Sequence, residues 1–222
     1  VRTWNHADHA SPWSQPVGFT VSTSCEGYTV AGYDPVKTRH APAAITDLGE
    51  GRCFIAFDRA YFGTVELTLD SDIDGQTVTV HLGEKLADDQ RIDRDPPGCI
   101  RHRAMQLTLR KGRHTYTIAI DPDERNTGPA AIAMPPSVGE VLPFRYCEIE
   151  GASSPITADD VRMVAVHYPF DDDAASFECS SDVLNRVWDL CQHTIKATSF
   201  CGLYVDGDRE RNEATARLLR ER

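Results

Sequence analysis

Residues 203–213 combine the side chains that acid–base chemistry needs. An apolar run, Leu203–Val205, precedes Gly207, which allows a sharp turn because it has no Cβ. The charged residues around this turn, here called the acid segment, are Asp206, Asp208, Arg209, Glu210 and Arg211. Carboxyl and guanidinium groups held this close shift one another's pKa values, which is one way to prepare a carboxyl group for proton transfer.

Glu210 is the candidate proton donor of the acid segment. Hydrolysis of a glycosidic bond needs one protonated carboxyl group on the leaving oxygen and a second group on the other side of the sugar. Nearby carboxylates raise the pKa of Glu210 and the adjacent arginines lower it, so a dry pocket would be needed to keep it protonated near neutral pH. Local composition by itself favours a plainer alternative, an ion-pair network that anchors the start of a helix.

A second polar cluster spans residues 91–103. It includes Arg91, Asp93, Arg94, Asp95, Arg101, His102 and Arg103 around Pro96-Pro97-Gly98. Arginine and aspartate hydrogen-bond sugar hydroxyls well, so a loop on the domain rim could bind a ligand. The local pattern favours a solvated turn whose backbone is set by the prolines and the glycine.

Composition excludes several classes of function. The net charge of −11 over 222 residues disfavours a nucleic-acid partner, since phosphate binding needs a basic face. The eight histidines lack the spacing of a metal site, and we expect no metal and no cofactor. No apolar run approaches the roughly 18 residues of a membrane span. Seven cysteines without a Cys-x-x-Cys pair favour free thiols and hence a reducing compartment, so the cytoplasm is favoured over the periplasm. The first residue is not methionine, so a leader could have been removed.

Alternating apolar residues predict a β-rich domain. The strand-like runs are 53–57, 63–69, 76–82, 105–109, 114–120, 144–150 and 161–167. We expect residues 105–109 and 114–120 to form a hairpin in which Gly112 takes a positive φ. The whole series predicts an antiparallel β-sandwich of the jelly-roll type.

The hydrophobic period changes to that of a helix after residue 180. Ser180 or Ser181 is a suitable N-cap, and apolar residues follow at steps of three and four over 182–198. Residues 168–176 form a linker with a short acidic run, and residues 212–222 again permit a helix. We therefore expect a β-sandwich domain over 1–170, and over 171–222 a linker and the first helices of an α domain.

Several segments together resemble the bacterial α-L-rhamnosidases of glycoside hydrolase family 78. Each motif is weak alone, but their order and spacing also agree between about residues 50 and 211. The segments are Gly83–Leu86, Arg91–Arg94, Phe144–Gly151, Asp160–Arg162, Ser176–Ser180 and Tyr204–Arg211.

The resemblance implies a fold, a reaction and roles for the acid segment. Family members place β-sandwich domains before an (α/α)6 toroid that cleaves terminal α-L-rhamnosyl groups with inversion. By the resemblance, Glu210 is the general acid and Asp206 helps to bind the sugar, while Asp208, Arg209 and Arg211 line the same segment. The partner would be a rhamnose-containing glycan or glycoside.

The family toroid continues for several hundred residues and carries the general base, whereas this sequence stops at Arg222. We therefore expect a truncated toroid and a 222-residue chain that is inactive by itself. Two alternatives stay open. One is a non-catalytic carbohydrate-binding or interaction module, and the other is a remnant whose helix leaves Leu184, Val187, Trp188 and Ile195 without a partner layer.

Overall fold

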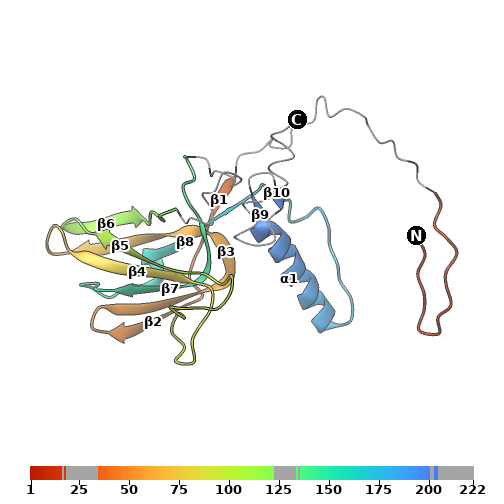
Figure 1. The fold of residues 1–222 in the computed structure, drawn as a ribbon, viewed down its shortest axis with the longest axis horizontal. Coiled ribbons are helices and arrows are strands. Elements are labelled where there is room, and N and C mark those ends of the chain that lie inside the picture. The colour runs from red at the N-terminus through yellow and green to blue at the C-terminus, as the bar shows by residue number, and fades with distance from the viewer. Residues whose placement is uncertain (17, 19–34, 123–133, 135, 201–202, 205–222) are drawn as a thin grey trace.

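A computed structural model describes residues 1–222 except 17, 19–34, 123–133, 135, 201–202 and 205–222 (Figure 1). The strands are β1 Val36–His40, β2 Ala44–Gly49, β3 Arg52–Ser71, β4 Thr77–Gly83, β5 His102–Thr108, β6 Gly112–Thr117, β7 Leu142–Glu150, β8 Val161–His167, β9 Ser199–Phe200 and β10 Leu203–Tyr204. The helices are the 3-10 turn η2 Ala158–Asp160 and the α-helix α1 Asp182–Thr198.

The longest strand, β3, belongs to both layers of the domain. The sequence predicted two separate strands here, over 53–57 and 63–69, and this prediction was wrong because β3 runs for 20 residues without a turn. Its first part pairs with β2 and β7, and its second part pairs with β8 and β6. The register shifts between Ala56 and Tyr61, where the strand bends from one layer into the other.

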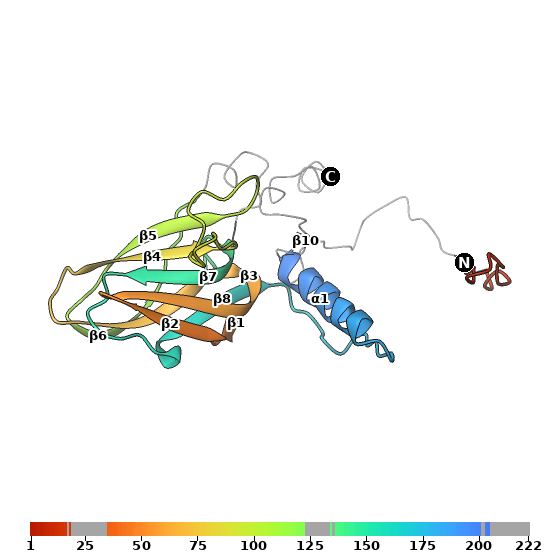
Figure 2. The ribbon, with the colours of Figure 1, turned by 90° about the horizontal axis from the view of Figure 1, so that it is seen from below.

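The strand pairing gives two antiparallel layers, β2-β3-β7-β4-β5 and β1-β8-β3-β6. One apolar core lies between them and takes fully buried side chains from both, among them Ile55, Val65, Leu67, Val80, Phe144 and Met163. Alternate residues of each strand point into this core, as the period of two requires. The predicted antiparallel β-sandwich is thus confirmed (Figure 2).

The expected hairpin between residues 105–109 and 114–120 is wrong. β5 pairs with β4, and β6 pairs with β3, so the chain passes from one layer to the other at 110–111. Leu109 explains the difference: it is buried, and its backbone N–H and C=O bond Gln76 and Gly75 at the start of β4. Gly112 does take the expected positive φ, of 90°.

Helix α1 spans the predicted residues 182–198 and lies beside one end of the sandwich (Figures 1 and 2). The Ser181 hydroxyl accepts a hydrogen bond from the Leu184 backbone N–H, which confirms it as N-cap. Trp188 is half-buried and stacks on Phe177 with ring centroids 5.6 Å apart. Much of the apolar stripe is exposed; Leu184, Val187 and Ile195 are 52%, 48% and 48% accessible.

The bend of β3 makes Gly63 sensitive to substitution. A Cβ there would collide with the carbonyl of Val164 on β8 and lie 3.0 Å from the Cα of Ala165. We expect Gly63→Ala to lower the free energy of unfolding by about 3 kcal/mol, measured by urea denaturation. Gly18→Ala is the control, because a Cβ there meets nothing within 4 Å. Equal stability of the two variants would contradict this account of the bend.

Candidate functional site

The residues of the acid segment, Asp206, Asp208, Arg209, Glu210 and Arg211, lie outside the described residues. The structure does describe part of the chain that leads to them, up to Phe200 and again at Leu203 and Tyr204. Helix α1 ends at Thr198, and β9 then pairs with β10, whose last residue is Tyr204. The backbone N–H of Tyr168 donates a 2.6 Å hydrogen bond to the carbonyl of Ser199. The end of α1 is therefore tied to the chain that leaves β8.

Four side chains from four elements meet where α1 contacts the sandwich, and we call this cluster the joint. Tyr61, on the bend of β3, stacks on His40 of β1 with centroids 4.7 Å apart and meets the edge of His193 of α1 at 4.6 Å. His167, the last residue of β8, lies 6.3 Å from the same Tyr61 ring. The His193 Nε2 donates to the carbonyl of Ala60 at 2.9 Å. The joint thus connects α1 to both layers.

Hydrogen bonds in the joint define the tautomers of two histidines. The Nδ1 of His167 lies 2.7 Å from the carbonyl of Tyr168, so this nitrogen carries the proton. In the neutral ring the Nε2 of His167 then accepts from the Thr38 hydroxyl at 3.2 Å. The same hydroxyl oxygen accepts from the Nε2 of His40 at 2.9 Å. A continuous chain of donors and acceptors therefore runs from β1 to the end of β8.

Burial keeps the joint histidines neutral. Desolvation is the main cause that lowers the pKa of His40, His167 and His193 below the ordinary value. The charge of Lys196 acts in the same direction on all three, and it is itself paired with Asp172 at 2.7 Å. Desolvation also raises the pKa of Tyr61. All four groups of the joint are consequently uncharged at neutral pH.

A cavity of about 590 Å³ lies between α1 and the bend of β3. Its walls are mainly apolar but include three arginines; the lining includes Arg59, Tyr61, Phe62, Arg145, Arg186 and Leu190. The Arg59 side chain spans the gap and donates to the carbonyl of Asp189 at 3.3 Å. A cavity of this size could hold a small organic molecule or an apolar side chain of another segment.

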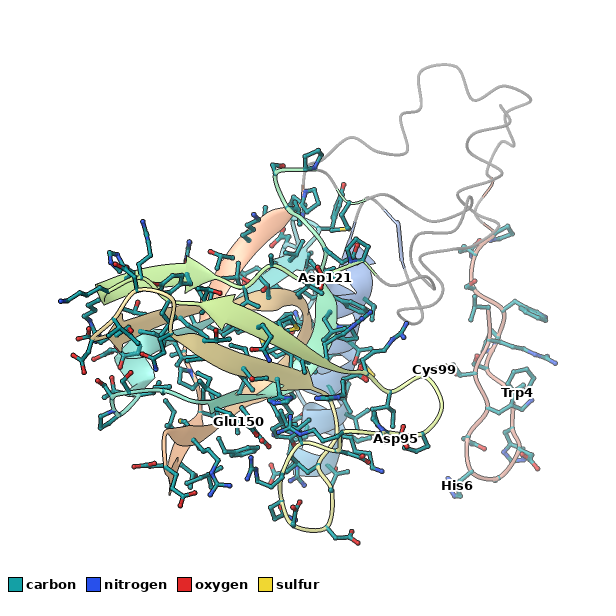
Figure 3. The ribbon with its side chains drawn as sticks, turned by 60° about the vertical axis from the view of Figure 1, so that its left-hand side comes forward. Trp4, His6, Asp95, Cys99, Asp121 and Glu150 are labelled. Carbon is teal, nitrogen blue, oxygen red and sulfur yellow. The ribbon has the colours of Figure 1, made fainter. Side chains whose placement is uncertain are left out.

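The cluster at residues 91–103 is built around a buried carboxylate that the sequence did not single out. Glu148 of β7 is fully buried, and it accepts hydrogen bonds from Arg91, from Arg94 at 2.7 Å and from the backbone N–H of Ile92 at 2.7 Å. The loop between β4 and β5 thus folds over the outer face of its own layer. The loop segment with Asp95 and Cys99 stands clear of the sheet (Figure 3).

The turn at residues 95–99 is largely exposed, as local composition predicted, but the residues that precede it are held on the sheet by Glu148. Burial acts to raise the pKa of Glu148, but the hydrogen bonds from Arg91 and Ile92 and the two arginine charges outweigh it, so the pKa lies below the ordinary value. The rings of His81 and His102 stack on each other beside Arg94. Desolvation is the largest cause that lowers their pKa values, and the charge of Arg94 is the second. The carboxylate therefore stays charged and holds the loop in place.

Sequence patterns could not reveal the joint, nor Glu148 at the centre of the cluster at residues 91–103. The histidines of the joint are far apart in the chain and meet because β1 pairs with β8 and α1 returns to β3. Glu148 alternates with the apolar residues Cys147 and Ile149, as an exposed strand residue would, so the sequence carried no signal of its burial. Among the residues that the structure describes, no three His, Cys, Asp or Glu side chains gather as a metal site would require. Within the same part of the chain, no helix has the length and apolar character needed to cross a membrane.

The model of the bacterial alpha-L-rhamnosidase concanavalin-like domain matches residues 46–167, more than half of the chain. The chain belongs to this rhamnosidase family. The matched range begins in β2 and ends at His167, the last residue of β8. No sequence among the curated proteins matches the chain. Of the segments that carried the resemblance, those from Gly83 to Arg162 fall within this match, whereas Ser176–Ser180 and Tyr204–Arg211 lie beyond it.

Solved structures of α-L-rhamnosidases share the fold of this rhamnosidase-family chain. The enzyme from Dictyoglumus thermophilum is 15% identical with a TM-score of 0.56, over 73% of this chain and 16% of that one. The Streptomyces avermitilis enzyme, complexed with L-rhamnose, is 19% identical with a TM-score of 0.54, over 78% and 15%. The Aspergillus terreus enzyme is 16% identical with a TM-score of 0.54, over 73% and 17%. The chain thus spans about a sixth of the length of these relatives.

The Glu148 cluster gives a test by pH. We expect Glu148→Gln to lower the free energy of unfolding by about 2 kcal/mol at pH 7, because Arg91 and Arg94 lose a buried counter-charge. The pKa of Glu148 is lower in the folded protein than its ordinary value of about 4.3. Its carboxylate therefore stabilises the fold fully above about pH 4.3, and this stabilisation is lost as the pH falls through the folded-state pKa. Urea denaturation from pH 7 to pH 3 should show the two curves converge. Glu50→Gln, at an exposed partner of Arg52, is the control, and an equal loss there would refute the proposed role of burial.

Proposed function

We propose that this chain is part of an α-L-rhamnosidase that hydrolyses terminal α-L-rhamnosyl groups with inversion. Within it, residues 1–170 form the accessory sandwich, and residues 171–222 form a linker and the start of the helical catalytic domain. The observation that carries the proposal is the family match over 46–167, which ends where the sandwich contacts α1. The L-rhamnose bound to the Streptomyces relative supports the same class of sugar for this chain.

The sandwich supports this function by holding the chain that leads into the acid segment. The Tyr168–Ser199 hydrogen bond and the contact of His193 with Ala60 fix the last turn of α1, and the paired strands β9 and β10 follow it directly. Backbone held on a rigid frame positions a catalytic group more precisely than a free loop does. We propose that the same support extends to the proton donor, Glu210.

In the proposed reaction, Glu210 donates its proton to the glycosidic oxygen as the bond to the anomeric carbon breaks. Asp206 accepts hydrogen bonds from sugar hydroxyls, and Asp208, Arg209 and Arg211 contribute to the same surface. A water molecule activated on the opposite face of the ring by a second carboxylate would complete an inverting displacement. The acid must be protonated and the base ionised, so activity should be bell-shaped with pH.

Glu210→Gln tests the assignment of the proton donor. In the protein that carries this chain, kcat on a methyl α-L-rhamnoside should fall at least about 100-fold, because the alkoxide leaving group needs a proton. The loss should be much smaller on a nitrophenyl α-L-rhamnoside, whose leaving group departs as a stable anion. Steady-state rates on both substrates provide the measurement.

Two matched variants complete this experiment. Asp206→Asn should raise KM more than it lowers kcat if the residue binds sugar hydroxyls. Glu213 is a neighbouring carboxyl group with no proposed role, and kcat and KM of Glu213→Gln should both stay within about twofold of the wild type. An equal loss on both substrates in Glu210→Gln would show that this residue is not the general acid. Absence of any rhamnoside hydrolysis by the wild-type protein would overturn the proposed function itself.

A further inference from the structure

The joint lies between the sandwich and the acid segment, and no part of the proposed chemistry uses it. Tyr61 of β3 is the ring that contacts His193 of α1, and His40 from β1 and His167 from β8 both lie against Tyr61. Six residues after His193, the Ser199 carbonyl accepts the hydrogen bond of Tyr168, the residue next to His167. The two attachments therefore act on the same end of the helix.

The joint is the main polar attachment of this helix end. Much of the apolar stripe of α1 is exposed, and Ala197 is its one buried residue among those described. Besides the Tyr168–Ser199 hydrogen bond, polar links join His193 to the Ala60 carbonyl, Arg59 to the Asp189 carbonyl, and Lys196 and Gln192 to Asp172 of the linker. The Arg59 and Asp172 partners are exposed charges, whose pairs contribute little. The partly buried aromatic contacts of Tyr61 and His193 therefore carry most of the directional constraint.

We propose that Tyr61, His167 and His193 are positioning residues of the proposed glycosidase site: they set where α1 ends and thereby where the acid segment begins. This inference rests on the proposed function. It assigns these residues no contact with the sugar. Their effect passes through α1 and the paired strands β9 and β10 to Asp206 and Glu210, which follow in the chain.

The same contacts make the attachment depend on pH. In the chain of hydrogen bonds from His40 through Thr38 to His167, the Nε2 of the neutral His167 accepts from the Thr38 hydroxyl. Protonation places a second donor against Thr38 and a charge beside Lys196. The charged and titratable groups that face the joint are Asp58 and Arg59 from β3, Asp172 from the linker, and Asp189 and Lys196 from α1.

The direction of the pH effect follows from the lowered pKa values. Because the attached state holds the joint histidines neutral, its stability is complete above the ordinary histidine pKa of about 6.5 and declines as the pH falls below it. Attachment of α1 should thus weaken as the pH falls below about 6.5. This decline begins at a higher pH than the protonation of Glu148.

Hydrogen exchange and kinetics on the protein that carries this chain test the inference together. His193→Ala should raise amide exchange over residues 182–204 about fivefold at pH 7, and lower kcat on an aryl α-L-rhamnoside about tenfold with little change in KM. His193→Gln keeps a donor for the Ala60 carbonyl but lacks the ring that contacts Tyr61, so it should recover only part of both losses at pH 7. It should also lose less helix protection than the wild type between pH 6.5 and pH 5, after correction for the intrinsic pH dependence of exchange.

His114→Ala is the matched control. This β6 histidine also bonds a backbone carbonyl, that of Lys111 at 2.9 Å, and contacts a tyrosine ring, but it lies outside the joint. It should leave helix exchange and kcat unchanged. Unchanged amide exchange in His193→Ala would show that the joint does not hold α1. Faster exchange with a normal kcat would show that the joint does not position the acid segment. Absence of rhamnoside hydrolysis by the wild-type protein would instead refute the proposed function. Amide exchange in the His193 variants would still test whether the joint holds α1.

Discussion

The structure depends on one strand that is paired along both edges in both layers. β3 forms hydrogen bonds with β2 and β7 in its first part and with β8 and β6 in its second, so neither layer exists without it. Its bend also carries Tyr61 and the Ala60 carbonyl that meet α1. The apolar core, the separation of the layers and the attachment of the helix are therefore consequences of one continuous backbone. Gly63 allows this continuity because β8 passes too close for a side chain.

Charge is used differently at the two polar clusters of the domain. At Glu148 a fully buried carboxylate stays ionised because two arginines and a backbone N–H satisfy it, and it holds a long loop on the sheet. At the joint the buried groups are neutral, and tautomers and ring contacts provide the order. The first arrangement is insensitive to pH near neutrality, whereas the second responds within the histidine range. The same sandwich thus contains one cluster, at Glu148, that is insensitive to pH near neutrality and one, the joint, that responds to it.

Local patterns predicted the elements well and their partners less well. The strand over 161–167 and the helix over 182–198 follow from clear periods of two and of about 3.6 residues, and the structure confirms both. Pairing is decided by core burial between distant residues, which is why the hairpin at Gly112 was wrong although its turn chemistry was right. The same limit hid Glu148 and the joint, since each needs residues far apart in the chain. The acid segment was found because its residues are adjacent, and its roles remain predictions.

The pairing of β1 with β8 has a consequence for synthesis. β1 is the first of the sandwich strands and β8 is the last, so the second layer cannot close until almost the entire domain has left the ribosome. Long-range pairing of this kind is slow compared with the formation of a helix. Because α1 is translated after β8, its attachment surface, formed by β1, β3 and β8, can be complete when the helix emerges. The order of translation then favours a frame that is built before the segment it must hold.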